Sequence, residues 1–173
     1  VSKLSDCAPY TVTKLARVGT GNEQVFWDFR NGETSTNPEV HDILYTAPGE
    51  YPVLLKLISE DGCVDTTTKT IIVKATPRTD FTIADSMFCT KDGNIDIILD
   101  NQTADANELS FEWSYNGLLP FSRSEQPGTL SLTNMFDDVE VKLVATHRIT
   151  GCADTLRHKV ISGHVVKLEV DFD

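Results

Sequence analysis

Apolar and polar residues alternate with a period of two along most of the chain, which is the pattern of half-buried β-strands. Val25, Trp27 and Phe29 share one face of such a strand, and an Asn31-Gly32 turn signal follows it. No long segment keeps the 3.6-residue period of an amphipathic helix. The pattern therefore predicts an all-β protein.

The same alternation recurs in several later segments, each bounded by turn residues. The other residues expected to face a core are Tyr51, Val53, Leu55, Leu57, Phe111, Trp113, Tyr115, Val139, Val141 and Leu143. Strands of this length, separated by Gly- and Pro-containing turns, are typical of a β-sandwich.

The chain also repeats itself. The motif Gly-Cys-Val-Asp-Thr at 62–66 returns as Gly-Cys-Ala-Asp-Thr at 151–155. Trp27 and Trp113 each precede a Lys-Leu pair by 29 residues, and an early cysteine precedes each Trp. Landmarks in the same order indicate two copies of one kind of domain.

The repeat predicts two tandem immunoglobulin-like β-sandwich domains. We place them at residues 1–76 and 77–173, with a short linker at 74–80. One core Trp and two distant cysteines per copy fit this fold class. The second copy has three extra residues between its Lys-Leu and Gly-Cys pairs, which lengthens a hairpin that we interpret as a contact loop.

The first copy resembles a PKD domain, the polycystic-kidney-disease type of β-sandwich, over about residues 5–73. The resemblance is carried by Trp27-Asp28-Phe29-Arg30-Asn31-Gly32, by Asn37-Pro38 with His41, by Tyr45, and by Gly49-Glu50-Tyr51-Pro52-Val53. Arg30-Asn31 stands where the family has Gly-Asp, so we expect Asn31-Gly32 to supply the positive-φ positions of this turn. The second copy lacks two of these motifs and is a divergent PKD-like or Ig-like domain.

The resemblance extends to the segments around the cysteines, which are similar to PKD modules in large surface and secreted proteins of Bacteroidetes-type bacteria. It implies that the cysteines bridge within each domain, Cys7 with Cys63 and Cys89 with Cys152. It also implies modules that extend a functional domain from a cell surface or that bind protein or glycan.

The composition limits the classes of molecule that the chain can bind. The net charge is −11, with 7 basic and 10 acidic residues in 1–76 and 8 and 16 in 77–173. This charge disfavours nucleic acid, which is bound through clustered Lys and Arg. No apolar run is long enough for a membrane helix, so we expect no membrane insertion. The start at Val1 suggests excision from a longer precursor, and four widely spaced cysteines favour disulfides and an extracellular or cell-surface location.

The most enzyme-like group is Asp28 with His41 and Asp42, near Ser35 and Thr36. A catalytic triad needs a nucleophile positioned by a base and a base oriented by an acid. Asp28 and His41 fall instead on positions that shape turns and strand ends, where an Asp accepts backbone N–H bonds. We therefore expect a structural role and no enzyme activity.

Metal ligands are the next candidates. The segment at 92–96, Asp-Gly-Asn-Ile-Asp, starts like a calcium loop, but Ile97 and Thr103 stand where an EF-hand needs Gly and Glu. Asp137, Asp138 and Glu140 form a second acidic cluster, which we interpret as protecting the start of a strand against aggregation. His158 and His164 lack a third ligand nearby and are expected to be solvated. We expect no cofactor, and a weak surface calcium site stays open as an alternative.

Exposed aromatic residues could bind a sugar, but Trp27 and Trp113 lie within apolar strand faces and are expected in the cores. Leu118, Leu119 and Phe121 form an apolar run in a loop-like stretch, which is the better candidate for a contact surface. An alternative places this run in a strand.

The expected function is that of a non-catalytic extracellular spacer or adhesion module of a larger bacterial surface or secreted protein, with a protein or glycan partner at the cell surface. The alternatives are an accessory region of a secreted hydrolase that binds its substrate, and a dedicated carbohydrate-binding protein.

Overall fold

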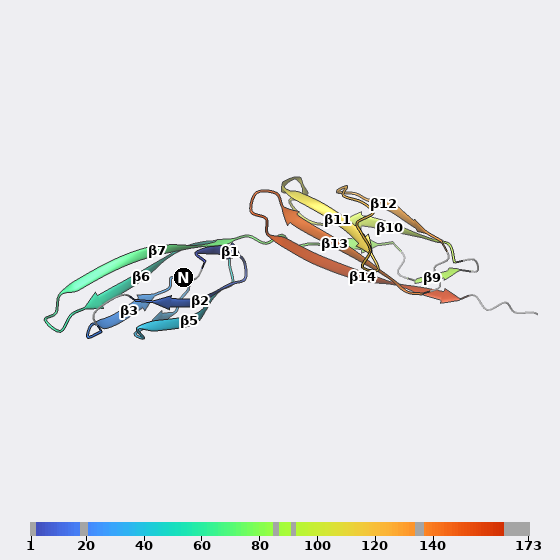
Figure 1. The fold of residues 1–173 in the computed structure, drawn as a ribbon. Coiled ribbons are helices and arrows are strands. Elements are labelled where there is room, and N and C mark those ends of the chain that lie inside the picture. The colour runs from blue at the N-terminus through green and yellow to red at the C-terminus, as the bar shows by residue number, and fades with distance from the viewer. Residues whose placement is uncertain (1–2, 18–20, 85–86, 91–92, 134–136, 165–173) are drawn as a thin grey trace, which may run out of the picture. The chain divides into compact units, whose positions relative to one another are not determined.

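The computed structural model describes residues 3–17, 21–84, 87–90, 93–133 and 137–164, except the side chains of 87, 89, 90 and 162–164. The chain divides into two compact units, Val1–Thr76 and Pro77–Asp173, at the boundary that the repeat predicts. Both units are β-sandwiches, so the predicted all-β, tandem immunoglobulin-like fold is confirmed (Figure 1). Within the described residues, no helix is both long and apolar enough to span a membrane.

Unit 1 has two sheets. The larger has the strand order β1-β7-β6-β3-β4, and the smaller pairs β2 with β5. The strands are β1 Ser5–Cys7, β2 Tyr10–Ala16, β3 Gln24–Asp28, β4 Thr34–Ser35, β5 Glu39–Tyr45, β6 Gly49–Ile58 and β7 Val64–Lys74. The short β1 lies parallel to the end of β7, whereas the other described pairings in this unit are antiparallel.

The predicted alternation forms the core of unit 1. Val25 and Trp27 of β3 and Val53 and Leu55 of β6 are buried, while the residues between them are more exposed. Tyr51 and Leu57 are only partly buried at the margin of this core. Trp27 pairs directly with Leu55 across the sheet, so the register brings the two apolar rows together.

Unit 2 has a four-stranded sheet with the order β11-β13-β14-β9 and a three-stranded sheet with the order β12-β10-β8. Its elements are β8 Phe81–Ile83, β9 Met87–Thr90, β10 Ile95–Asn101, the 3-10 turn η1 Ala106–Glu108, β11 Leu109–Tyr115, β12 Gly128–Leu132, β13 Val139–His147 and β14 Ala153–His164. As in unit 1, the cysteine-bearing β9 lies parallel to the last strand.

The core of unit 2 also follows the predicted pattern. Trp113 of β11 pairs with Leu143 of β13, and Phe111 pairs with Ala145. These four side chains are buried, as is that of Val141. Tyr115 is partly buried at the end of this row.

The linker is shorter than predicted, because β7 continues through Lys74 and β8 begins at Phe81. The hydroxyl of Thr76 donates a hydrogen bond to the carbonyl of Ala8 within unit 1. The backbone N–H of Thr79 donates to a carboxylate oxygen of Asp154 within unit 2. Only residues 77 and 78 therefore lie between the two anchored ends.

Candidate functional site

Asp28 is the last residue of β3 and begins the turn to β4. One carboxylate oxygen accepts a 2.9 Å hydrogen bond from the backbone N–H of Arg30, and the other lies 3.0 Å from the Arg30 guanidinium. The Asn31 amide donates to the carbonyl of Leu44, and its oxygen accepts from the backbone N–H of Glu33. These polar side chains satisfy the backbone groups of a tight turn, as an Asx-type residue does.

The conformation of this turn corrects one prediction. Its positive-φ residues are Arg30, at 61°, and Gly32, at 98°, whereas Asn31 is not one of them. An arginine thus occupies the left-handed region in this turn, and the Asp28 carboxylate contacts both its backbone and its side chain. A local interaction of this kind offsets the steric cost that a non-glycine residue has at such φ values.

Tyr45 and Tyr51 lie side by side in unit 1. The Tyr45 and Tyr51 ring centroids are 4.5 Å apart. The hydroxyl of Tyr45 donates a 3.1 Å hydrogen bond to the carbonyl of Phe29, and that of Tyr51 donates to the carbonyl of Ala47. Burial is the main cause that raises the pKa of Tyr45 to about 12. Tyr45 therefore remains a neutral donor inside the core.

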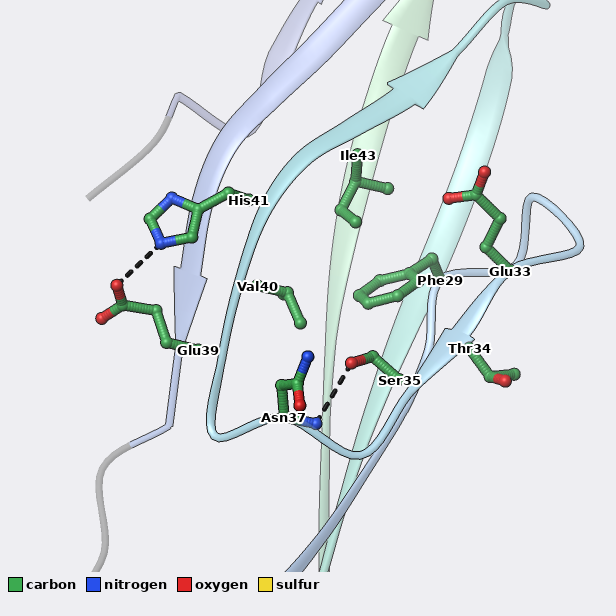
Figure 2. Close-up of a pocket in the computed structure, with 9 residues that line it drawn as sticks. All are labelled: Phe29, Glu33, Thr34, Ser35, Asn37, Glu39, Val40, His41 and Ile43. Atoms are coloured by element: carbon green, nitrogen blue, oxygen red, sulfur yellow. Dashed lines mark hydrogen bonds and ion pairs between the residues drawn. The ribbon is translucent and has the colours of Figure 1, made fainter.

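A shallow hollow of about 480 Å³ lies beside β5, and we call it the His41 hollow. It is lined by Phe29, Glu33, Thr34, Ser35, Asn37, Glu39, Val40, His41 and Ile43. Figure 2 shows His41 and Glu39 on one flank and Ser35 and Thr34 on the other, with Val40, Phe29 and Ile43 between them. The hollow therefore has an apolar middle and polar margins.

The imidazole of His41 is held within its own sheet. Its Nε2 lies 2.8 Å from a carboxylate oxygen of Glu39, and its Nδ1 lies 3.1 Å from the carbonyl of Thr13. Lys14 approaches the other Glu39 oxygen at 2.6 Å. The hydrogen bond from Lys14, followed by that from His41, lowers the pKa of the Glu39 carboxyl.

The catalytic alternative needs His41 to reach a hydroxyl and an acid to reach His41. Ser35 Oγ instead accepts a hydrogen bond from the backbone N–H of Asn37. Asp28 interacts with Arg30 at the turn, and the exposed Asp42 has a left-handed backbone. The hydrogen bonds of Asp28, Ser35 and His41 thus lead to three different places, and these residues do not form a triad.

Both Trp side chains are core residues, as predicted. Trp27 is buried, and its indole N–H donates to the carbonyl of Asn37. Trp113 is buried too, and its N–H donates to the carbonyl of Ser124. Neither ring offers a face on which a sugar could stack.

The predicted contact surface is formed in part. Leu118 and Leu119 follow β11 and are 55% and 88% exposed. Phe121 is partly buried, packs against the core of unit 2, and lies 6.1 Å from Tyr115 between ring centroids. The run lies outside the named strands, so the strand alternative is wrong, apart from a bridge at the next residue, Ser122. The two leucines are the exposed part of this surface.

Another exposed apolar residue lies in the lengthened hairpin between β13 and β14. Ile149 is 91% exposed at its tip. The backbone N–H groups of Ile149 and Thr150 lie within hydrogen-bond distance of His147 Nδ1, and the His147 Nε2 is 3.3 Å from Glu108. The three extra residues in the sequence pointed to this loop, but not to the residue that it presents.

The disulfide pairing predicted for unit 1 is wrong. Cys63 is an exposed free cysteine. The register pairs Cys7 with Lys74, at the end of β7, whereas Cys63 precedes Val64, at its start. The two cysteines are therefore roughly 35 Å apart at the usual rise of a strand, and a disulfide needs Cα atoms within about 7 Å.

The register also excludes the pairing predicted for unit 2. The side chain of Cys89 lies outside the described residues, but its backbone pairs with Gly163 near the end of β14. Cys152 precedes Ala153, at the start of that strand. Among the described side chains, Cys7 and Cys152 are disulfide-bonded.

Two residues of the acidic cluster at 137–140 form ion pairs. Asp138 lies 2.6 Å from Lys159, and Glu140 lies 3.4 Å from Arg157. Asp92 and His164, named above as candidate ligands, fall outside the described side chains. In the described ranges, no group of three or more His, Cys, Asp or Glu residues is placed to hold a metal ion. His158 is not fully solvated, because its ring lies 4.5 Å from that of Phe81.

Comparison with known proteins gives structural likenesses only. No family model matches the chain. No curated protein matches it. Similar solved structures include the fibronectin(III)-like modules of Clostridium thermocellum CbhA, at 13% identity and a TM-score of 0.41 over 100% of this chain and 96% of that chain. The insect immune protein hemolin matches at 13% identity and 0.46, over 95% and 45%. The extracellular domains 3–5 of Drosophila OTK match at 14% identity and 0.41, over 94% and 59%. Likenesses this weak assign neither a ligand nor a partner to this chain.

Proposed function

We propose that this chain is a non-catalytic spacer and interaction module of a larger extracellular bacterial protein. It presents another domain or binds protein or glycan at the cell surface. The observation that carries the proposal is the use of the enzyme-like polar residues: Asp28 and Asn31 hold a turn, and His41 bonds within its own sheet. A module whose polar residues are committed to the fold is suited to mechanical and binding roles.

The resemblance of residues 5–73 to PKD modules supports the same role, as does the short connection between the units. An extracellular setting is supported by the disulfide-bonded Cys7 and Cys152, since disulfides persist in oxidising compartments. We expect no cofactor and no nucleic-acid partner, because an excess of acidic residues repels phosphates.

The exposed surface at Leu118 and Leu119 is where we expect a partner to bind. Two large apolar side chains, 55% and 88% exposed, lie next to each other in a loop of unit 2. Exposed apolar groups that adjoin each other are more typical of contact surfaces than isolated ones are.

The test is a glycan array probed with the fluorescently labelled chain and with a Leu118→Ser/Leu119→Ser variant. The matched control is Ile98→Ser, which removes an apolar side chain of the same 55% exposure from the sheet face of β10. We expect binding that falls at least tenfold in the double variant and is unchanged in the control. Mass spectrometry of the array glycans after incubation should find none cleaved.

Two results would contradict the proposal. Cleavage of a glycan by the purified chain, reduced by His41→Ala, would make the His41 hollow an active site. Binding that survives the double variant but is lost with Ile98→Ser would move the contact surface to β10. If no glycan binds, the same three proteins are tested on immobilised surface proteins, and no difference among them would exclude the Leu118–Leu119 surface.

A further inference from the structure

The base of the hairpin between β13 and β14 is closed by backbone hydrogen bonds. The N–H of His147 donates to the carbonyl of Cys152 at 2.8 Å, and the N–H of Gly151 donates to the carbonyl of His147 at 2.9 Å. The N–H of Arg148 donates to the carbonyl of Glu108, the last residue of η1, at 3.0 Å. These bonds fix the base of the hairpin but do not reach its tip.

The tip is held by a side chain. The imidazole Nδ1 of His147 lies 3.2 Å from the backbone nitrogen of Ile149 and 3.4 Å from that of Thr150. A backbone N–H can only donate, so Nδ1 is the acceptor and carries no proton in this arrangement. The other ring nitrogen, Nε2, lies 3.3 Å from a carboxylate oxygen of Glu108 and is the nitrogen that carries the proton. A neutral imidazole therefore satisfies both contacts.

A second proton on this imidazole would break one contact and strengthen the other. In the protonated ring both nitrogens are donors. The Nδ1–H group would then face the N–H groups of Ile149 and Thr150, donor against donor. The Nε2–H group would still donate to Glu108, in a charge-assisted hydrogen bond. The ring is thus retained by Glu108 while the tip loses its acceptor.

The charged residues around the imidazole come from the hairpin, η1 and the start of β14. Glu108 is the one within ion-pair distance of the ring. Arg148 follows His147 in the hairpin, and Asp105 precedes η1. Asp154, near the start of β14, already accepts a backbone N–H, and the residue of β11 that pairs with His147 is uncharged. Among the described residues, Glu108 is therefore the charged group that contacts the ring.

The geometry points to His147 as a pH-sensitive switch of this hairpin. With a neutral imidazole the tip is fixed, and Ile149 is presented in one position with 91% of its surface exposed. When the imidazole takes up a proton, the tip is released while the base stays closed by its backbone bonds. Histidine is the side chain that ordinarily changes its charge between pH 5 and 8. Mild acidity therefore alters the contact loop without unfolding unit 2.

The experiment measures backbone order along the hairpin by NMR relaxation of the isotope-labelled chain at pH 8 and pH 5, the limits of the range in which histidine titrates. At Ile149 and Thr150 we expect order parameters of about 0.85 at pH 8 and below about 0.6 at pH 5. The order parameters of Arg148 and Cys152 should not change, because their N–H groups bond at the base. The nitrogen chemical shifts of the His147 ring should show the Nε2–H tautomer at pH 8.

Two variants separate the acceptor from its titration. His147→Asn is the matched control, because an Asn side chain accepts the N–H two residues further on, as in an Asx turn, but does not titrate. Its tip should be ordered at both pH values. His147→Ala removes the acceptor, and its tip should be mobile at both. Both variants keep His158, so protonation of that residue would act equally in all three proteins.

Several results would overturn the proposal. A tip that is equally ordered at pH 8 and pH 5 in the unsubstituted chain would show that protonation releases nothing. A loss of order at pH 5 that persists in His147→Asn would assign the effect to another group. An ordered tip in His147→Ala would show that the imidazole does not hold it. A ring protonated on Nδ1 at pH 8 would exclude that nitrogen as an acceptor.

Discussion

Replacing Tyr45 by Phe tests the packing of unit 1 through its pH dependence. Tyr45 is 1% exposed, and its hydroxyl donates to the carbonyl of Phe29 at 3.1 Å. At neutral pH, Tyr45→Phe leaves that carbonyl without its partner, which should lower the free energy of unfolding by about 1–2 kcal/mol.

The destabilisation caused by Tyr45→Phe should shrink at alkaline pH. The pKa of Tyr45 is about 12 in the folded protein and 10.0 for a free tyrosine. A pKa raised by folding means that the unfolded chain loses the proton first, so wild-type stability is present below pH 10 and is lost as pH rises toward 12. The loss is about 1.4 kcal/mol at pH 11 and approaches roughly 3 kcal/mol above pH 12. Tyr45→Phe removes this loss, since Phe does not titrate.

The assay is urea unfolding of both proteins at pH 8, 10 and 11, in a Trp113→Phe background so that Trp27 reports on unit 1. The destabilisation caused by Tyr45→Phe should be largest at pH 8 and shrink by about 1.4 kcal/mol at pH 11. Tyr51→Phe is the matched control, because its hydroxyl bonds at an exposed site. A difference between wild type and Tyr45→Phe that stays constant with pH would refute the buried, raised-pKa hydroxyl.

Three further changes test other parts of the structure. Phe81→Ala should lower the unfolding free energy of unit 2 by about 3–5 kcal/mol, since it empties the space against Trp113; urea unfolding followed by Trp113 fluorescence in a Trp27→Phe background measures this, and a cost below 1 kcal/mol would contradict the packing. Arg30→Gly should raise the melting temperature slightly, by relieving left-handed strain of about 1 kcal/mol, and a clear decrease would show that the ion pair with Asp28 outweighs the strain. Without reductant, maleimide should label Cys63, and labelling of Cys7 to the same extent would disprove its disulfide.

Strand alternation predicted much of the fold. Residues such as Trp27, Val53, Trp113 and Val141 lie in the cores. When apolar residues occupy every second position of a strand and one face of the sheet is buried, that apolar face must be the buried one. The repeat located the unit boundary for a similar reason, since two copies of one pattern need two cores.

The cysteine pairing could not be predicted in this way. Spacing along the chain does not reveal which end of a strand a neighbour meets, and here the parallel register of β1 on β7 separates Cys7 from Cys63 by the whole strand. The prediction for the turn at Arg30 was wrong for a local reason. The Asp28 carboxylate stabilises an arginine with a left-handed backbone, and residue preferences alone do not indicate this.

The candidate surface was predicted only in outline. The residue types from Leu118 to Phe121 are all apolar or proline. They do not reveal that the two leucines are exposed while the ring of Phe121 packs near that of Tyr115.

The parallel pairing of β1 with β7 has a mechanical consequence. Hydrogen bonds from Ile72 N–H to the Leu4 carbonyl and from Ala8 N–H to the Lys74 carbonyl bracket this pair. If the chain is pulled from its two ends, the load reaches β1 from one direction and β7 from the other, along the strand axes. The bonds between them are then strained together in shear and do not open one after another. A unit built in this way resists tension at the point where force enters and leaves it, and β9 on β14 repeats the arrangement in the second unit.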